Sequence, residues 1–178
     1  MSRTALKKEL STLTAPQLVE VILDAYAARK EIRDYFEYYL NPDVSKLMDK
    51  YLKIVIREFG KSKYRHSKAR TSVVKKALKD FTSYSPGDDA EIKALQHTVD
   101  VMAAAEWKYN FSDSQWNLVN FIAHKLLEIA DRGCRFDVTF AALSHIASPE
   151  RHLASSRFRD CIIEAIEEYN SLKRSINN

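Results

Sequence analysis

The amino-acid sequence predicts an all-α protein, folded as an antiparallel helical bundle or a short irregular helix stack of eight or nine helices. Three observations lead to this fold class. Apolar residues recur at i, i+3/4 and i+7 along most of the chain, which is the spacing of one helix face. The 178 residues include only three glycines, too few for the many tight hairpin turns of an all-β protein. No segment reads convincingly as a strand.

Residues 32–59 are the clearest part of the chain and predict two helices joined by a short turn. Apolar and aromatic side chains fall on one face of each helix, and Asn41 and Pro42 lie between them. Asparagine caps free backbone N–H groups, and proline fits the first turn of a helix, where it loses no hydrogen bond. Because so short a turn brings the helices back alongside each other, we expect their aromatic faces to meet each other or a third helix.

Two helices are predicted before this pair. Residues 6–13 give a short first helix, and Thr14, Pro16 and Gln17 have the pattern of a capping box at the start of the second. The buried face of the second helix is expected to hold Leu18, Val21, Ile22, Ala25 and Tyr26. Five tyrosines at helical spacing are predicted to be core aromatics rather than the lining of a ligand site: Tyr26, Tyr35, Tyr38, Tyr39 and Tyr51.

The later helices follow from the same periodicity and from turn residues. Gly60 ends the fourth helix, Gly133 ends the seventh, and residues 84–88 form the clearest break in the chain. The remaining helices are predicted to contain the apolar residues of segments 69–81, 92–103, 116–130, 136–147 and 158–172. We expect one domain over residues 1–178, or two halves at 1–84 and 88–178.

One segment is strongly basic. Residues 61–79 contain eight basic side chains and no acidic one, whereas the whole chain has a formal net charge of +4, which leaves −4 for the other residues. Such a patch can bind a polyanion, present itself to a protein, or remain a solvated surface that pairs with acids such as Glu164, Glu167 and Glu168. The candidate binding residues are Lys61, Lys63, Arg65, Lys68, Arg70, Lys75, Lys76 and Lys79. Lys68, Lys75 and Lys79 are expected on one stripe of the fifth helix.

Signals for catalysis and metal binding are weak. His124 and Glu128 are four residues apart on a predicted helix, so they are the candidates for a metal site, but the H-E-x-x-H motif is absent. Neither a Gly-rich phosphate loop nor a G-x-S-x-G motif is present. Cys134 and Cys161 are expected to be buried thiols. We therefore expect no cofactor and do not favour an enzyme.

The sequence also bears on the compartment. No run of about 18 apolar residues exists, so no membrane span is expected. The first residues lead into a charged helix and lack the apolar centre of a signal peptide. These features predict a cytoplasmic protein.

The N-terminal part resembles an uncharacterised bacterial family that is known only as a numbered domain of unknown function. The similarity covers about residues 5–81 and rests on Leu6-Lys7-Lys8, Tyr39-Leu40-Asn41-Pro42 and Lys75-Lys76-Ala77. The resemblance implies a small helical cytoplasmic protein and supplies no catalytic residue, substrate or cofactor.

The main functional hypothesis is a non-enzymatic binding or adaptor module that uses helix surfaces, with a protein or a nucleic acid as its partner. The first alternative is sequence-independent binding of nucleic acid or another polyanion through residues 61–79, by phosphate contacts without base readout. The others are a metal-dependent protein built on His124 and Glu128, and a structural homo-oligomer.

Overall fold

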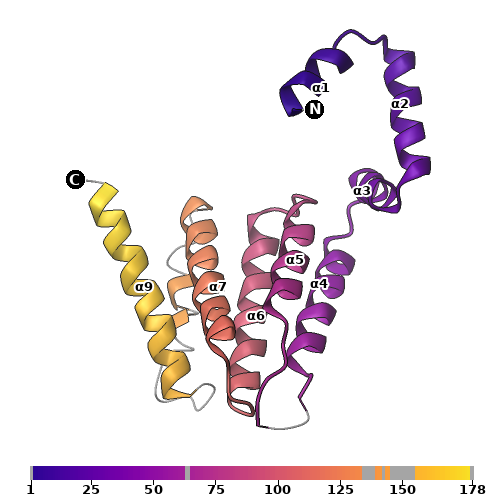
Figure 1. The fold of residues 1–178 in the computed structure, drawn as a ribbon. Helices are drawn as coiled ribbons and strands as arrows, with labels where there is room; N and C mark the ends of the chain where they lie inside the picture. Colours follow the sequence, from indigo (N-terminus) through magenta and orange to yellow (C-terminus); the bar gives the residue numbers. More distant parts are fainter. Residues whose placement is uncertain (1, 63–64, 134–138, 142, 145–154, 177–178) are drawn as a thin grey trace. The chain divides into compact units, whose positions relative to one another are not determined.

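The computed structural model describes residues 2–62, 65–133, 139–141, 143–144 and 155–176. These residues form helices joined by short connections, and the one β-type pairing among them is an isolated bridge between His66 and Asn110 (Figure 1). The predicted all-α fold is confirmed. The helices of the described residues are α1 Arg3–Leu10, α2 Ala15–Ala28, α3 Lys30–Leu40, α4 Val44–Phe59, α5 Thr71–Thr82, α6 Asp88–Glu106, α7 Asp113–Arg132 and α9 Ser156–Ile176.

The chain divides into two compact units, Met1–Asp43 and Val44–Asn178. The first contains α1 to α3, and the second contains α4 and everything after it. The predicted break at residues 84–88 is a tight connection between α5 and α6 in which Gly87 has a φ of 94°, and both of these helices belong to the second unit. The single-domain organisation of residues 1–178 stays a prediction.

Helix starts and ends in the first unit follow the sequence, but burial does not. Thr14 and Gln17 form the predicted capping box, and Arg29 adopts an extended conformation that separates α2 from α3. The expected buried face of α2 is wrong, since Val21 and Ile22 are 45% and 43% exposed. None of the described residues of α1, α2 or α3 is buried. The reason is that the three helices are short and α2 and α3 are the main pair in contact, so they have too little surface to cover one another.

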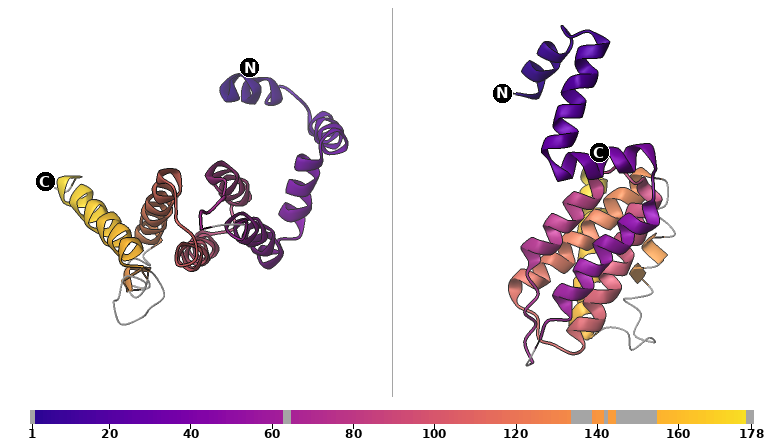
Figure 2. Two further views of the ribbon diagram at one scale, coloured as in Figure 1. Left: turned by 60° about the horizontal axis from the view of Figure 1, so that its bottom comes forward. Right: turned by 90° about the vertical axis from the view of Figure 1, so that its right-hand side faces the viewer.

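The second unit is a short stack of helix pairs. The pairs α4/α5 and α6/α7 are packed antiparallel, α4 also packs on α6, and α9 packs on α7. In Figure 2 (left), α4 and α6 lie in one layer while α5 and α7 lie in the other. Of the two predicted architectures, the irregular helix stack describes this arrangement. The predicted eighth helix falls mostly outside the described residues, of which 139–141 and 143–144 are helical.

The core of the second unit is made by the apolar faces that the sequence periodicity predicts. Within the predicted segments, Val73 and Val101 are half-buried, and the other apolar residues of α5 and α6 are buried: Val74, Ala77, Leu78, Phe81, Ile92, Ala94, Leu95, Val99, Met102 and Ala103. The largest fully buried side chains are Phe59, Phe81, Phe158, Leu95, Met102, Leu118, Ile122, Leu126, Leu127, Ile129, Leu143 and Ile162. At about 1.5–3 kcal/mol for each large apolar side chain removed from water, these residues are the main stabilising contribution.

The prediction for the tyrosines is correct at one position. Tyr51 is 2% exposed, whereas Tyr35 and Tyr39 are 43% and 67% exposed, and Tyr26 and Tyr38 are half-buried. The reason is that α4 packs on α5 and α6, while α2 and α3 have no layer to cover them within their own unit. The expected aromatic nucleus of residues 32–59 is therefore contributed by α4 and not by α3.

Tyr51 joins α4 to α6 through a buried hydrogen bond. Its hydroxyl lies 2.8 Å from Thr98 Oγ1, which donates its own proton to the Ala94 carbonyl, so Tyr51 is the donor. Burial raises the pKa of Tyr51 to about 12. We expect Tyr51→Phe to lower the free energy of unfolding by about 1 kcal/mol, the typical contribution of one such bond. Urea denaturation measures this, and a loss above about 3 kcal/mol would mean that the hydroxyl has a further role.

Candidate functional site

The basic segment of residues 61–79 does not form one continuous cationic surface. Lys61 and Arg70 both pair with Glu58, near the end of α4. The Lys75 ammonium lies 4.7 Å from the centre of the Phe121 ring on α7. Lys63 lies outside the described residues. Three of the eight predicted binding residues are therefore engaged within the protein itself.

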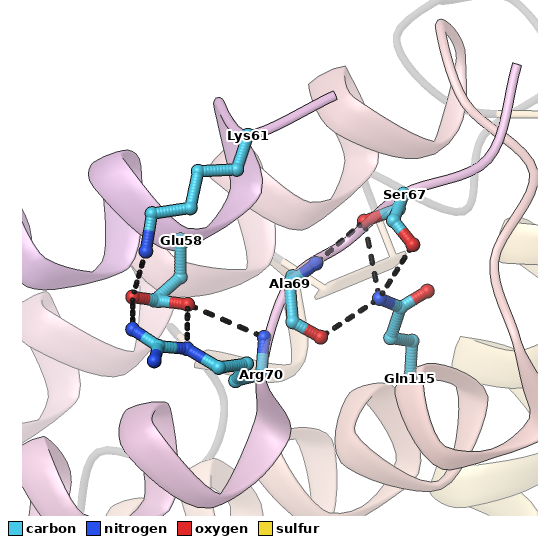
Figure 3. Close-up of polar contacts among 6 residues, drawn as sticks. All are labelled: Glu58, Lys61, Ser67, Ala69, Arg70 and Gln115. Atoms are coloured by element: carbon cyan, nitrogen blue, oxygen red, sulfur yellow. Dashed lines mark hydrogen bonds and ion pairs between the residues drawn. The ribbon is translucent and has the colours of Figure 1, made fainter. Parts of the chain in front are cut away.

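Glu58 is the centre of a polar cluster at the junction of α4 and α5 (Figure 3). Its side chain is fully buried, and the Arg70 guanidinium donates two bonds to its carboxylate, at 2.8 Å to Oε1 and 3.1 Å to Oε2. Lys61 Nζ lies 2.6 Å from Oε1, and the backbone N–H of Arg70 reaches Oε2 at 3.3 Å. One carboxylate is thus held by two cations and by the backbone at the start of α5.

The electrostatics follow from these contacts. The Arg70 hydrogen bond is the strongest influence and, together with Lys61 and the Arg70 backbone N–H, lowers the pKa of Glu58 to about 2, although burial acts in the opposite direction. A paired carboxylate of this kind stays ionised and is a poor proton acceptor, which makes it unsuited to general acid–base catalysis near neutral pH.

Gln115, in the first turn of α7, fixes the same connection from the other side. Its Nε2 donates to Ser67 Oγ at 3.1 Å and to the Ala69 carbonyl at 3.0 Å (Figure 3). Its Oε1 accepts the backbone N–H of Ser112 at 3.0 Å, completing a capping box. Residues 67–70 are therefore held between the end of α4 and the start of α7.

Four further basic residues of the segment are also exposed: Arg65, Lys68, Lys76 and Lys79. Within the described part of the chain, none of the four forms an ion pair with an acid. The predicted helical stripe is wrong at Lys68, because α5 begins only at Thr71. The Arg70 backbone N–H bonds to Glu58, and Arg70 has the extended conformation of a residue just outside the helix.

The two candidate metal ligands do not face a common point. His124 Nε2 lies 2.9 Å from Glu168 Oε2 on α9, whereas Glu128 Oε2 lies 3.0 Å from Lys125 Nζ. No group of three or more His, Cys, Asp or Glu side chains suited to a metal ion occurs among the described residues. Both contacts lie on the helix surfaces, and the hydrogen bond between His124 and Glu168 links α7 to α9.

The cysteines give no sign of a nucleophile in the described residues. Cys161 is half-buried, and its burial, with Glu164 and Glu168 nearby, raises the pKa of its thiol, opposite to the shift of a reactive cysteine. Cys134 lies outside the described residues.

Sequence reasoning missed the residues that organise this site. The available signal was the spacing of Glu58, in the last turn of α4, and Lys61, just past the end of that helix. A separation of three residues favours an ion pair. The capping spacing from Ser112 identifies Gln115 as a helix-start residue. Its contacts with Ser67 and Ala69 join positions more than 40 residues apart, which no local pattern shows.

Comparison with known protein families identifies the family of this chain. A model of a family of unknown function, DUF6155, matches residues 1–115. The chain belongs to the DUF6155 family. The match extends beyond the predicted limit of residue 81 and includes Glu58, Arg70 and Gln115. No curated protein and no solved structure matches the chain. None of the helices in the described residues combines the length and the apolar character needed to cross a membrane.

Proposed function

We propose that this DUF6155 protein is a non-enzymatic binding module that presents helix surfaces to a protein partner. The observation that supports it most directly is the exposed apolar surface of the first unit. None of its described residues is buried. Its exposed large apolar side chains are Leu6, Val19, Val21, Ile22, Leu23, Tyr35, Tyr39 and Leu40.

Physical reasons connect this surface with binding. Helices of 8, 14 and 11 residues are marginal in water unless an apolar face is covered. The α2–α3 pair does have internal order: Tyr26 donates to Glu37 at 3.3 Å, and the rings of Tyr35 and Tyr39 are stacked with centres 6.5 Å apart. A preformed helix pair that exposes leucine, isoleucine and tyrosine has the composition of a recognition surface.

The proposal extends to chemistry and compartment. Glu58, the fully buried carboxylate of the described residues, is already neutralised by Arg70 and Lys61, which supports a structural rather than a catalytic role for it. We place the protein in the cytoplasm, where the Cys161 thiol would stay reduced.

The test is competitive capture from a cell extract with three immobilised proteins: the native chain, L23D/Y39D, and the matched control E20Q/E31Q on the same two helices. Loss of an interface anchor commonly costs about 2 kcal/mol or more, so we expect L23D/Y39D to retain less than about a tenth of the specific partner. The control should retain all of it. Equal retention by both variants, or no specific retention by the native chain, would contradict the proposal.

A second candidate function is sequence-independent binding of nucleic acid through the exposed part of the basic segment. The specific observation in its favour is that Arg65, Lys68, Lys76 and Lys79 are exposed without an acidic partner in the described residues. Phosphate contacts of this kind position a duplex without reading its bases. If it is correct, K68E/K76E/K79E abolishes salt-sensitive binding of duplex DNA, and unchanged binding would exclude it.

A further inference from the structure

The exposed side of α9 has a short row of acids around an apolar side chain. Asp160, Glu164 and Glu167 occur at i, i+4 and i+7, the spacing of one side of a helix, and Ile163 lies among them. All four side chains are exposed, and Ile163 is 41% exposed. None of the three acids forms an ion pair within the described part of the chain. We call these four residues the α9 row.

A basic and apolar surface lies where α5 meets α7. Lys75 Nζ lies 4.7 Å from the centre of the Phe121 ring, and both side chains are exposed. Their direct contact therefore marks the solvent-facing junction of the two helices. Lys79 is also exposed and lies one turn after Lys75 on the same side of α5. We call Lys75, Lys79 and Phe121 the α5/α7 seam.

The two lysines of the seam have no counter-ion. An aromatic ring attracts an ammonium group but does not neutralise its charge, so Lys75 remains available to an acid. Lys79 forms no ion pair in the residues that the structure describes. The Phe121 ring beside them is 40% exposed. On the α7 side the positive surface ends at Lys125, which pairs with Glu128.

The α9 row and the α5/α7 seam match in charge, spacing and apolar content. Residues four apart on a helix are about 6 Å apart along its axis, and this is the spacing of the two lysines and also of Asp160 and Glu164. Each surface has one large exposed apolar side chain beside its charges, Phe121 or Ile163. Within one chain α7 lies between α5 and α9 (Figure 1; Figure 2, left), so a row and a seam of the same chain do not face each other.

We propose that the α9 row of one copy binds the α5/α7 seam of a second copy of this chain. Because the row and the seam are different surfaces, the contact is heterologous, and a pair of copies keeps one free row and one free seam. Such a contact extends into a chain of copies or closes into a ring. A few charge pairs around one apolar contact make a small interface, so the association is weak and sensitive to salt. The inference goes beyond the proposed function, since it needs neither the first unit nor a foreign partner.

Nucleic acid is the less suitable partner for the seam. The acids Asp80 on α5 and Glu128 on α7 are exposed on the same two helices, and both would repel a long phosphate backbone. A helix with three acids within eight residues needs only the lysines of one turn. Binding of nucleic acid to the seam is therefore an outcome that the experiment must separate from self-association.

The experiment measures the molar mass of the full chain by analytical ultracentrifugation from about 5 to 200 µM, at about 50 and 300 mM salt. It compares the native protein with K75E/K79E in the seam, D160K/E164K in the row, and the charge-swapped chain that contains all four substitutions. The matched control is K53E/R57E on α4, which changes the net charge as K75E/K79E does, at exposed positions outside both surfaces.

The native molar mass should rise with concentration and fall at the higher salt. Like charges that face each other across an interface oppose binding, so K75E/K79E and D160K/E164K should each self-associate at least about tenfold more weakly. The charge-swapped chain should recover association to within about fivefold of the native protein, because its pairs are restored with opposite sign. An equimolar mixture of the two double variants should associate although neither does alone, and the control should behave as the native chain does.

Several results would overturn the inference. They include a native chain that is monomeric at about 200 µM in the lower salt, where even weak association is detectable. Equal weakening by K53E/R57E would indicate an effect of net charge alone, and a charge-swapped chain that does not recover would exclude the pairing. An unchanged molar mass with weaker binding of duplex DNA by K75E/K79E would assign the seam to nucleic acid.

The design keeps the inference testable if one variant does not fold. The two surfaces lie on different helices, so D160K/E164K tests the contact without K75E/K79E. Self-association that is lost in L23D/Y39D and retained in K75E/K79E would assign it to the first unit and contradict the inference. Partner capture by Leu23 and Tyr39 is read separately, so the two proposals fail independently.

Discussion

Replacing Phe59 with alanine is expected to lower the free energy of unfolding by about 3–5 kcal/mol, the usual range for truncating a buried phenylalanine. Phe59 is the last residue of α4 and is 2% exposed. Its ring lies 5.6 Å from that of Phe111, which in turn lies 5.5 Å from Trp116. The cavity would open where α4 meets the α6–α7 connection, and helices on several sides limit its collapse.

Urea denaturation measures this effect as a lower midpoint with an unchanged slope. The matched control is Ile56→Ala on the same helix, where the side chain is 56% exposed and the change should stay within about 0.5 kcal/mol. If the two substitutions cost the same, Phe59 is not a core residue and the packing described for α4 is incorrect.

Replacing Glu58 with glutamine is expected to cost about 2–3 kcal/mol, because it removes charge-assisted hydrogen bonds from a buried carboxylate. This loss of stability is smaller than for a fully buried ion pair, because the side chains of Arg70 and Lys61 are 60% and 41% exposed. Water can therefore solvate the two cations when the carboxylate is removed. The connection from Lys61 to Arg70 should also exchange its amide protons faster. Glu128→Gln is the control, because its ion pair with Lys125 is exposed and should contribute less than about 1 kcal/mol.

The cost of Glu58→Gln should depend on pH in a defined direction. The pKa of Glu58 is lowered from its ordinary value of 4.5 to about 2, so the folded state binds a proton less readily than the unfolded state. The stabilisation is therefore complete above about pH 5 and is lost as the pH falls toward 2. The difference in stability between the native chain and the variant should shrink over this interval. A difference that stays constant down to pH 2 would contradict the ion-pair assignment.

The spacing of apolar residues along the sequence was sufficient to predict which face α5 and α6 of the second unit bury. The apolar periodicity identified all four buried residues of α5 and five of the nine of α6, because each of these helices is covered by neighbours on its apolar side. The same periodicity failed for α2 and α3. Amphipathic spacing shows which face a helix would bury, but not whether another element is present to cover it, so Val21, Ile22 and Tyr39 are exposed.

The candidate sites differ in how far sequence could predict them. The run of cations at residues 61–79 is visible without a structure. The pairing of two of its members, Lys61 and Arg70, with Glu58 was not visible, because it depends on the fold that brings Arg70 back to the end of α4.

Amide hydrogen exchange of the full chain, resolved by peptide, tests the central claim that the binding surface lies on a first unit with no core of its own. Helices without buried side chains open at low free-energy cost, so α1, α2 and α3 should exchange orders of magnitude faster than α6 and α7, whose amides should report the global stability of the stack. Exchange of α2 and α3 as slow as that of α6 and α7 would contradict the account, because it would show that their apolar faces are already covered in the free protein.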